Sequence, residues 1–95
     1  MPEVRFLVRW PDASTDDCYS PSTAIKEHLA AGTPYALADF LARSRRGLGA
    51  ASERVRAKYG FACSSAMDQL ARIETKAAAF QGDGDAVVRV ERFSP

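Results

Sequence analysis

Extended segments at both ends of the chain constrain its fold more than any other sequence feature. Residues 4–10 place apolar side chains at every second position, and residues 86–93 are rich in β-branched valines. A period of two is typical of strands that are buried on one face. Because the two segments come from opposite ends of the chain, we expect one sheet to hold both, with the helical residues between them packed against it.

Turn-forming residues 12–16 predict a hairpin in which residues 17–19 form a short second strand. We therefore expect an α+β fold with a three-stranded antiparallel sheet and its helices on one face. The C-terminal strand is predicted to pair with the first strand, which leaves the hairpin partner at an edge. A chain of 95 residues is long enough for a single domain with one modest core.

Helices are predicted between the hairpin and the last strand, so that the element order is ββαααβ. The first begins with Ser20 as its N-cap and ends at Gly32. A connector at residues 33–35 leads to the main helix, which covers residues 36–59. The third helix opens at Ser65, which has the spacing of a capping box.

An apolar stripe along the main helix is predicted to face the core. The stripe comprises Leu37, Phe40, Leu41, Leu48, Ala51, Val55 and Tyr59. Gly47 and Gly49 each cost about 1 kcal/mol of helix stability relative to Ala, so a break is expected near them. Gly60 is predicted to end the helix, with Phe61 making the apolar contact that accompanies such a cap. The predicted core consists of Phe6, Val8, Trp10, Phe40, Leu41, Val55, Leu70, Ile73 and Val88.

Positive charge is concentrated on the same helix. Residues 43–58 contain six basic residues and one acidic residue, which gives this segment a net charge of +5. The whole chain has a net charge of +1, so the rest of the chain has a net charge of −4. The six are predicted to bind a partner: Arg43, Arg45, Arg46, Arg54, Arg56 and Lys58. The interpretations are a solvated helix surface, an acidic protein or oligomer contact, or nucleic acid. Nucleic acid is disfavoured because no aromatic residues interleave with the basic ones.

Small residues lie on the side of the main helix opposite the apolar stripe. They are Ala38, Ala42, Gly49 and Ala57. Such residues permit the close approach of a second helix, although alanines also simply favour helix formation. Together with the acidic turns at residues 12–17 and 82–85, they predict a homodimer held by the main helix.

Cysteine and histidine positions predict no metal site and no cofactor. The spacing of Cys18, His28 and Cys63 matches no tight pair of zinc ligands. The N-terminus lacks the pattern of a signal peptide and no stretch has the roughly 20 apolar residues that span a bilayer, so we expect a cytoplasmic protein with reduced thiols. Cys63 precedes a helix N-terminus, where a thiol can become reactive, but its apolar neighbours favour a buried thiol. No catalytic constellation is apparent, which favours a non-enzymatic role.

Four segments carry a resemblance to a known family. They are MPEVRFLVRWPD at the N-terminus, CYSPST from residue 18, YALADFLARS from residue 35 and SERVRAKYGFACSSAMDQLARIE from residue 52. Over roughly residues 1–80 the chain resembles the nitrogen starvation response family, small bacterial proteins encoded beside a nitrilase in a gene cluster. The resemblance implies a cytoplasmic accessory protein made alongside a nitrilase, a radical enzyme, an acetyltransferase-like protein and a flavoprotein. It implies no catalytic residues.

The leading functional hypothesis is a non-catalytic accessory protein that binds a protein partner from the same gene cluster through its charge-polarised surface. One alternative is a small-ligand or thiol-dependent protein that uses Cys63. A second alternative is a nucleic-acid-binding regulator that uses the basic helix.

Overall fold

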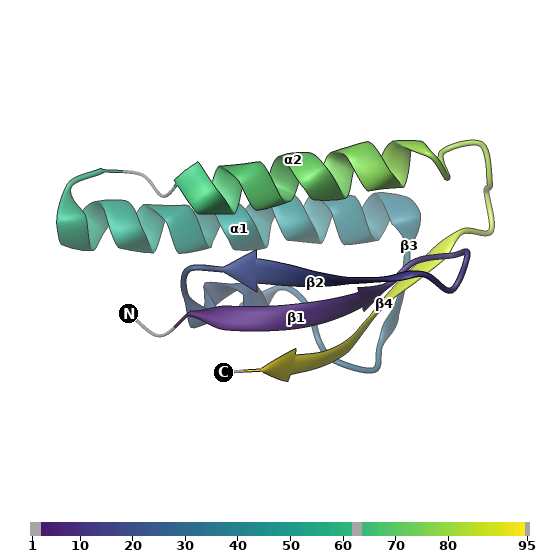
Figure 1. Cartoon of the computed structure of the whole chain (residues 1–95), viewed down its shortest axis with the longest axis horizontal. Helices are drawn as coiled ribbons and strands as arrows, with labels where there is room; N and C mark the ends of the chain where they lie inside the picture. The colour runs from purple at the N-terminus through teal and green to yellow at the C-terminus, as the bar shows by residue number, and fades with distance from the viewer. Residues whose placement is uncertain (1–2, 62–63, 95) are drawn as a thin grey trace.

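The fold is a sheet with two long helices packed on one face, as the computed structural model in Figure 1 shows. The structure describes residues 3–61 and 64–94. Within these ranges one antiparallel sheet has the order β2-β1-β4-β3 and is formed by β1 (Val4–Arg9), β2 (Thr15–Ser20), β3 (Pro34–Ala36) and β4 (Val87–Ser94). The helices are α1 (Leu37–Tyr59) and α2 (Ser64–Ala78), and the short 3-10 helix η1 (Thr23–Glu27) packs beside α1. Neither α1 nor the described α2 is long and apolar enough to cross a lipid bilayer.

The α+β class is confirmed, but the prediction of a three-stranded sheet is wrong. The missing strand is β3, in the segment predicted to be a connector, where Tyr35 pairs with Val88 of β4. The Tyr35 hydroxyl also accepts a hydrogen bond from the backbone N–H of Ala30 at 2.8 Å. A strand of three residues that begins with proline has too few positions to show a period of two, so its pairing with β4 alone defines it. The predicted pairing of the terminal strand with β1, with β2 at an edge, is confirmed.

The first predicted helix is a single short 3-10 turn, and it begins later than expected. Ser22, and not Ser20, is the N-cap. Its Oγ accepts a hydrogen bond from the backbone N–H of Ala24 at 3.1 Å. The Ser20 hydroxyl instead donates to the Ser22 carbonyl at 2.8 Å, a local hydrogen bond that competes with helix formation. Gly32 follows with a φ of +78°, and its N–H donates to the Val90 carbonyl at 2.7 Å, which holds this turn against β4.

Contrary to the expected break, α1 runs without interruption through Gly47 and Gly49. A Cβ atom on Gly47 would lie 2.5 Å from Cδ1 of Ile25 and 3.3 Å from Cβ of His28. Gly47 therefore allows η1 to approach α1 closely, and the packing gained offsets the low helix propensity of glycine. The helix ends as predicted at Gly60, which has the left-handed φ of +83°.

A β-bulge at Glu91 controls which side chains of β4 face the core. Val90 pairs with Val8, but the next paired residue is Arg92, opposite Leu7. Strict alternation would place position 92 on the core face and position 93 on the outer face, and the bulge reverses both. Phe93 therefore packs beside Phe6, with ring centroids 6.2 Å apart, and Arg92 lies on the outer face, which no described helix covers.

The core agrees with the predicted one except at two positions. Val55 and Leu70 are half-buried, and the other seven predicted residues are buried. Tyr59, the last residue of the predicted stripe, is exposed. Figure 1 shows the reason, because the C-terminal end of α1 extends beyond the sheet and has no strand beneath it.

Candidate functional site

The six basic residues predicted to bind a partner lie along α1, and several of them pair within the molecule. Arg45 Nη2 lies 2.9 Å from a carboxylate oxygen of Glu74 on α2, and Arg54 Nη2 lies 3.0 Å from one of Glu27 on η1. Exposed ion pairs of this kind stabilise a fold by only about 0–1 kcal/mol. The carboxylates of a partner could therefore replace them at little cost. Arg46 is exposed and forms no ion pair with the described residues.

Arg43 is held more firmly than the others. Its Nε lies 3.0 Å from Asp39 Oδ2, and its Nη1 donates to the His28 carbonyl at 3.1 Å. The guanidinium carbon also lies 5.0 Å from the centre of the Tyr35 ring, a cation–π contact. These contacts connect α1 to the end of η1 and to β3, so Arg43 stabilises the fold at this place.

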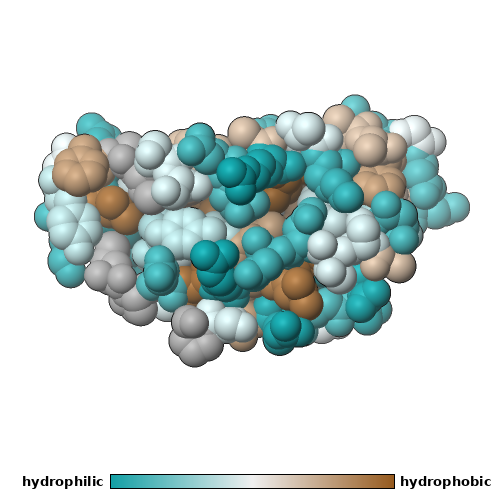
Figure 2. Space-filling model, in the orientation of Figure 1, coloured by the Kyte–Doolittle hydropathy of each residue, from teal (hydrophilic) through white to brown (hydrophobic). Residues whose placement is uncertain are grey.

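Two aromatic rings are exposed at the C-terminal end of α1, beside the last basic residues. Tyr59 is 52% exposed and Phe61 is 67% exposed, and their ring centroids lie 6.4 Å apart. Lys58 Nζ lies 5.6 Å from the centre of the Tyr59 ring, and Arg56 forms only a loose 3.6 Å pair with Glu53. Figure 2 shows apolar surface among hydrophilic side chains at this end of the molecule. We call the following residues the α1 tip: Arg54, Arg56, Lys58, Tyr59 and Phe61.

Sequence reasoning found the basic residues of the α1 tip but not its aromatic ones. Helical spacing predicts a buried Tyr59, and the helix cap predicts a covered Phe61, whereas both rings are exposed. The signal that could have shown this is the length of the helix. At 1.5 Å per residue, 23 helical residues extend about 35 Å, longer than the strands predicted beneath them.

The small-residue side of α1 faces solvent. Ala38 and Ala57 are exposed, Ala42 and Gly49 are half-buried, and a Cβ on Gly49 would meet no atom within 4 Å. This side is accessible to a second helix, and the homodimer stays a prediction.

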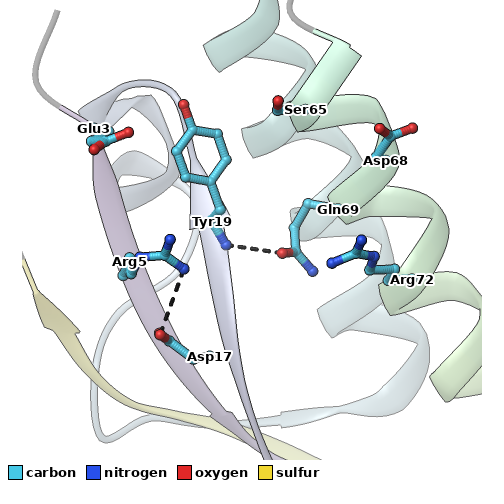
Figure 3. Close-up of a pocket in the computed structure, with 8 residues that line it drawn as sticks. All are labelled: Glu3, Arg5, Asp17, Tyr19, Ser65, Asp68, Gln69 and Arg72. Atoms are coloured by element: carbon cyan, nitrogen blue, oxygen red, sulfur yellow. Dashed lines mark hydrogen bonds and ion pairs between the residues drawn. The ribbon is translucent and has the colours of Figure 1, made fainter.

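A polar groove of about 450 Å³ follows the edge strand β2 and the start of α2. Figure 3 shows the residues that line it: Glu3, Arg5, Asp17, Tyr19, Ser65, Asp68, Gln69 and Arg72. The Gln69 Oε1 atom accepts a hydrogen bond from the Tyr19 backbone N–H at 3.0 Å. An open edge strand can pair with another chain, and Gln69 blocks one of its backbone donors. The sequence gives no signal for this groove, because its two sides lie far apart in the chain.

Cys18 is a buried thiol on the core face of β2. Burial, followed by the negative charges of Asp16 and Asp17, raises the pKa of the Cys18 thiol to about 12. Cys63 lies outside the described residues, so its predicted burial stays a prediction. His28 forms the C-cap of η1. No group of three or more His, Cys, Asp or Glu side chains within the described residues could hold a metal ion.

Because Cys18 is buried and protonated, we expect a thiol reagent to label it slowly in the folded protein at neutral pH. The measurement is the alkylation rate of a Cys63→Ser chain, with the same chain in denaturant as the control. The pKa of the Cys18 thiol is higher in the folded chain than in the unfolded chain. The protonated thiol therefore contributes to the free energy of unfolding below about pH 9, and this contribution is lost as the pH rises toward 12. Equally fast labelling of folded and denatured chains at pH 7 would show that Cys18 is accessible.

Fold and surface together define a small α+β protein whose exposed features are charged and aromatic patches. The chain belongs to the family described as nitrogen starvation-induced protein NitG, whose model matches residues 5–93. The match confirms the family resemblance and extends it through the bulged part of β4. The chain matches no curated protein and no solved structure.

Proposed function

We propose that this protein is a nitrogen-starvation-induced accessory protein that acts by binding another protein and not by catalysis. The α1 tip is its docking surface, and the partner presents an apolar pocket rimmed by carboxylates. We further propose, from what the resemblance implies, that the partner is encoded in the same nitrilase-containing gene cluster. The single observation that carries the proposal is the exposure of two adjacent aromatic rings at the end of a basic helix.

The apolar part of the α1 tip supports binding because adjacent exposed rings form the kind of patch that marks interaction sites. Aromatic residues and arginine are enriched at the centres of protein interfaces and account for much of their binding energy. Fully burying a Phe side chain contributes about 1.5–3 kcal/mol. The contact between Tyr59 and Phe61 also restricts both rings before binding, which lowers the entropy lost on association.

Charge at the α1 tip sets the chemistry of the partner. Lys58 lies over the Tyr59 ring, and Arg54 and Arg56 precede it in the last turns of α1, where their ion pairs with Glu27 and Glu53 are exposed. Since such pairs are weak, carboxylates of a partner can compete for these cations. Complementary charge mainly raises the association rate and fixes orientation, so binding should weaken as salt is added.

A site-specific photo-crosslinker tests the docking surface in nitrogen-starved cells. Phe61→p-benzoylphenylalanine should capture one specific protein, identified by mass spectrometry. Adding Arg56→Glu and Lys58→Glu should reduce that capture at least tenfold, because both changes place like charge against the carboxylates of the partner.

The matched control places the same photo-crosslinker at Gln81, an exposed position just beyond the opposite end of α2. We expect no specific capture there. The same protein captured equally from both positions, or capture from Phe61 that is unchanged by the charge reversals, would contradict the proposal.

A further inference from the structure

The outer face of the sheet carries a second concentration of positive charge, unrelated to α1. Arg5 and Arg9 lie on this face of β1, and Arg89 and Arg92 lie on the same face of β4, the strand beside it. All four side chains are exposed, and no described helix covers them. We call these four residues the arginine face.

The bulge at Glu91 builds the arginine face. Without it, Arg92 would face the core and Phe93 would face solvent. Bulges often occur where a strand must re-aim a side chain at a functional position. Here the bulge turns Phe93 toward the core, where it is half-buried, and places Arg92 on the outer face.

The arrangement of the arginines is unfavourable for the isolated fold. Arg9 lies directly opposite Arg89 in the strand pair, and like charges at such positions destabilise a sheet. Arg9 is partly compensated by Glu91 at 2.8 Å, and Arg5 by Asp17 at 3.6 Å. Arg89 and Arg92 form no ion pair with the described residues, so two guanidinium groups remain available.

Apolar side chains lie beside the arginines on the same face. Leu7 is half-buried in the middle of the face, opposite Arg92. Val87 is 47% exposed two residues before Arg89, and it faces Ala36 of β3. A ligand on this face would therefore bury Leu7 among the guanidinium groups and Val87 at the end of the face beyond Arg89.

We infer that the arginine face is a second docking surface, separate from the α1 tip, that binds an acidic segment of a protein through carboxylates paired with Arg89 and Arg92. Guanidinium groups bind carboxylates through two parallel hydrogen bonds, a geometry that lysine lacks. All the cations described on this face are arginines, and arginine is enriched at protein interfaces whereas lysine is depleted.

Other occupants fit the face less well. A second copy of the chain would place arginines against arginines. Single-stranded nucleic acid needs aromatic rings on which bases stack, and the aromatic ring described on this face is that of Tyr19, with the Arg5 guanidinium 6.0 Å from its centre.

The test is a direct binding measurement with purified full-length protein and a fluorescent ten-residue glutamate-rich peptide as the probe. Arg89→Glu with Arg92→Glu should lower the affinity for the peptide at least tenfold. A carboxylate at position 89 would face Arg9 across the strand pair, so the sheet should tolerate this change. If the double charge-reversal variant nevertheless unfolds, Arg89→Gln with Arg92→Gln is used in its place. That variant should bind the peptide at least fivefold more weakly.

Arg45→Glu with Arg46→Glu is the matched control, because it makes the same change in net charge on α1 at two exposed positions outside the α1 tip. We expect it to change peptide affinity less than twofold. Equal losses of peptide affinity for the two double variants would overturn the inference, because the peptide would then be attracted by the overall charge of the protein. Tighter binding of a single-stranded RNA of equal charge than of the peptide would also overturn it. The assay uses no cellular partner and leaves the α1 tip aromatics intact, so its failure is distinguishable from a failure of the proposed function.

Discussion

Phe40→Ala should lower the free energy of unfolding by about 3–5 kcal/mol, the loss expected when a buried phenylalanine leaves a cavity. Phe40 lies on α1 and is fully buried. Its ring meets the Trp10 ring edge-on, with centroids 5.6 Å apart, and Trp10 in turn stacks on Phe80 at 6.1 Å. Besides leaving a cavity, the removal of Phe40 therefore breaks the ring contact that joins α1 to Trp10, the residue that follows β1.

Leu70→Ala is the comparison for Phe40→Ala. Leu70 is half-buried at the edge of the core, so its truncation should cost less than about 2 kcal/mol, below the range for fully buried leucines. Both losses are measured by urea unfolding monitored by circular dichroism. Trp10 fluorescence is not used as the signal, because Phe40→Ala changes the surroundings of Trp10. Equal losses at the two positions would show that the described packing of α1 and α2 on the sheet is incorrect.

Gly47→Ala should destabilise the protein even though alanine is the better helix former. The added Cβ would overlap Ile25, which is itself fully buried and has no free space into which to move. Overpacking of this kind costs about 1–3 kcal/mol, against a gain in helix propensity of about 1 kcal/mol.

Gly49→Ala is the matched control, two residues further along the same helix. Nothing lies within 4 Å of the added Cβ there, so only the propensity gain applies and stability should rise by up to about 1 kcal/mol. Thermal and urea unfolding of the two variants should therefore differ by about 1–3 kcal/mol, the overpacking term alone. Stabilisation by Gly47→Ala equal to that by Gly49→Ala would mean that η1 does not pack on α1 as described.

Local patterns in the sequence were sufficient to predict the regular elements. Alternation over residues 4–10 identified β1, and turn residues identified the hairpin to β2. Helical spacing located α1 to within one residue at its start, and Gly60 marked its end. These features could be predicted because each depends on backbone preferences and side-chain periodicity within a few neighbouring residues.

The candidate surfaces were predicted only in part. The basic residues of α1 could be read from the sequence, but their ion pairs with Glu27 and Glu74 join elements that are remote in the chain. Exposure of Tyr59 and Phe61 depends on where the sheet ends beneath α1. Which side chains form ion pairs, and which are covered by another element, depends on the assembled fold. A pattern among neighbouring residues does not contain this information.

By itself, then, the sequence determined the α+β class, the amphipathic helices and the pairing of the two terminal strands, because hydrophobic periodicity and turn chemistry act locally. Only the tertiary structure decided that Pro34–Ala36 is a strand, since three residues become a strand through pairing with β4 and not through their own pattern. It also decided the face on which Arg92 lies. A bulge shifts the alternation by one residue, and the packing of the half-buried Phe93 against the core beside Phe6 is the physical reason for that shift.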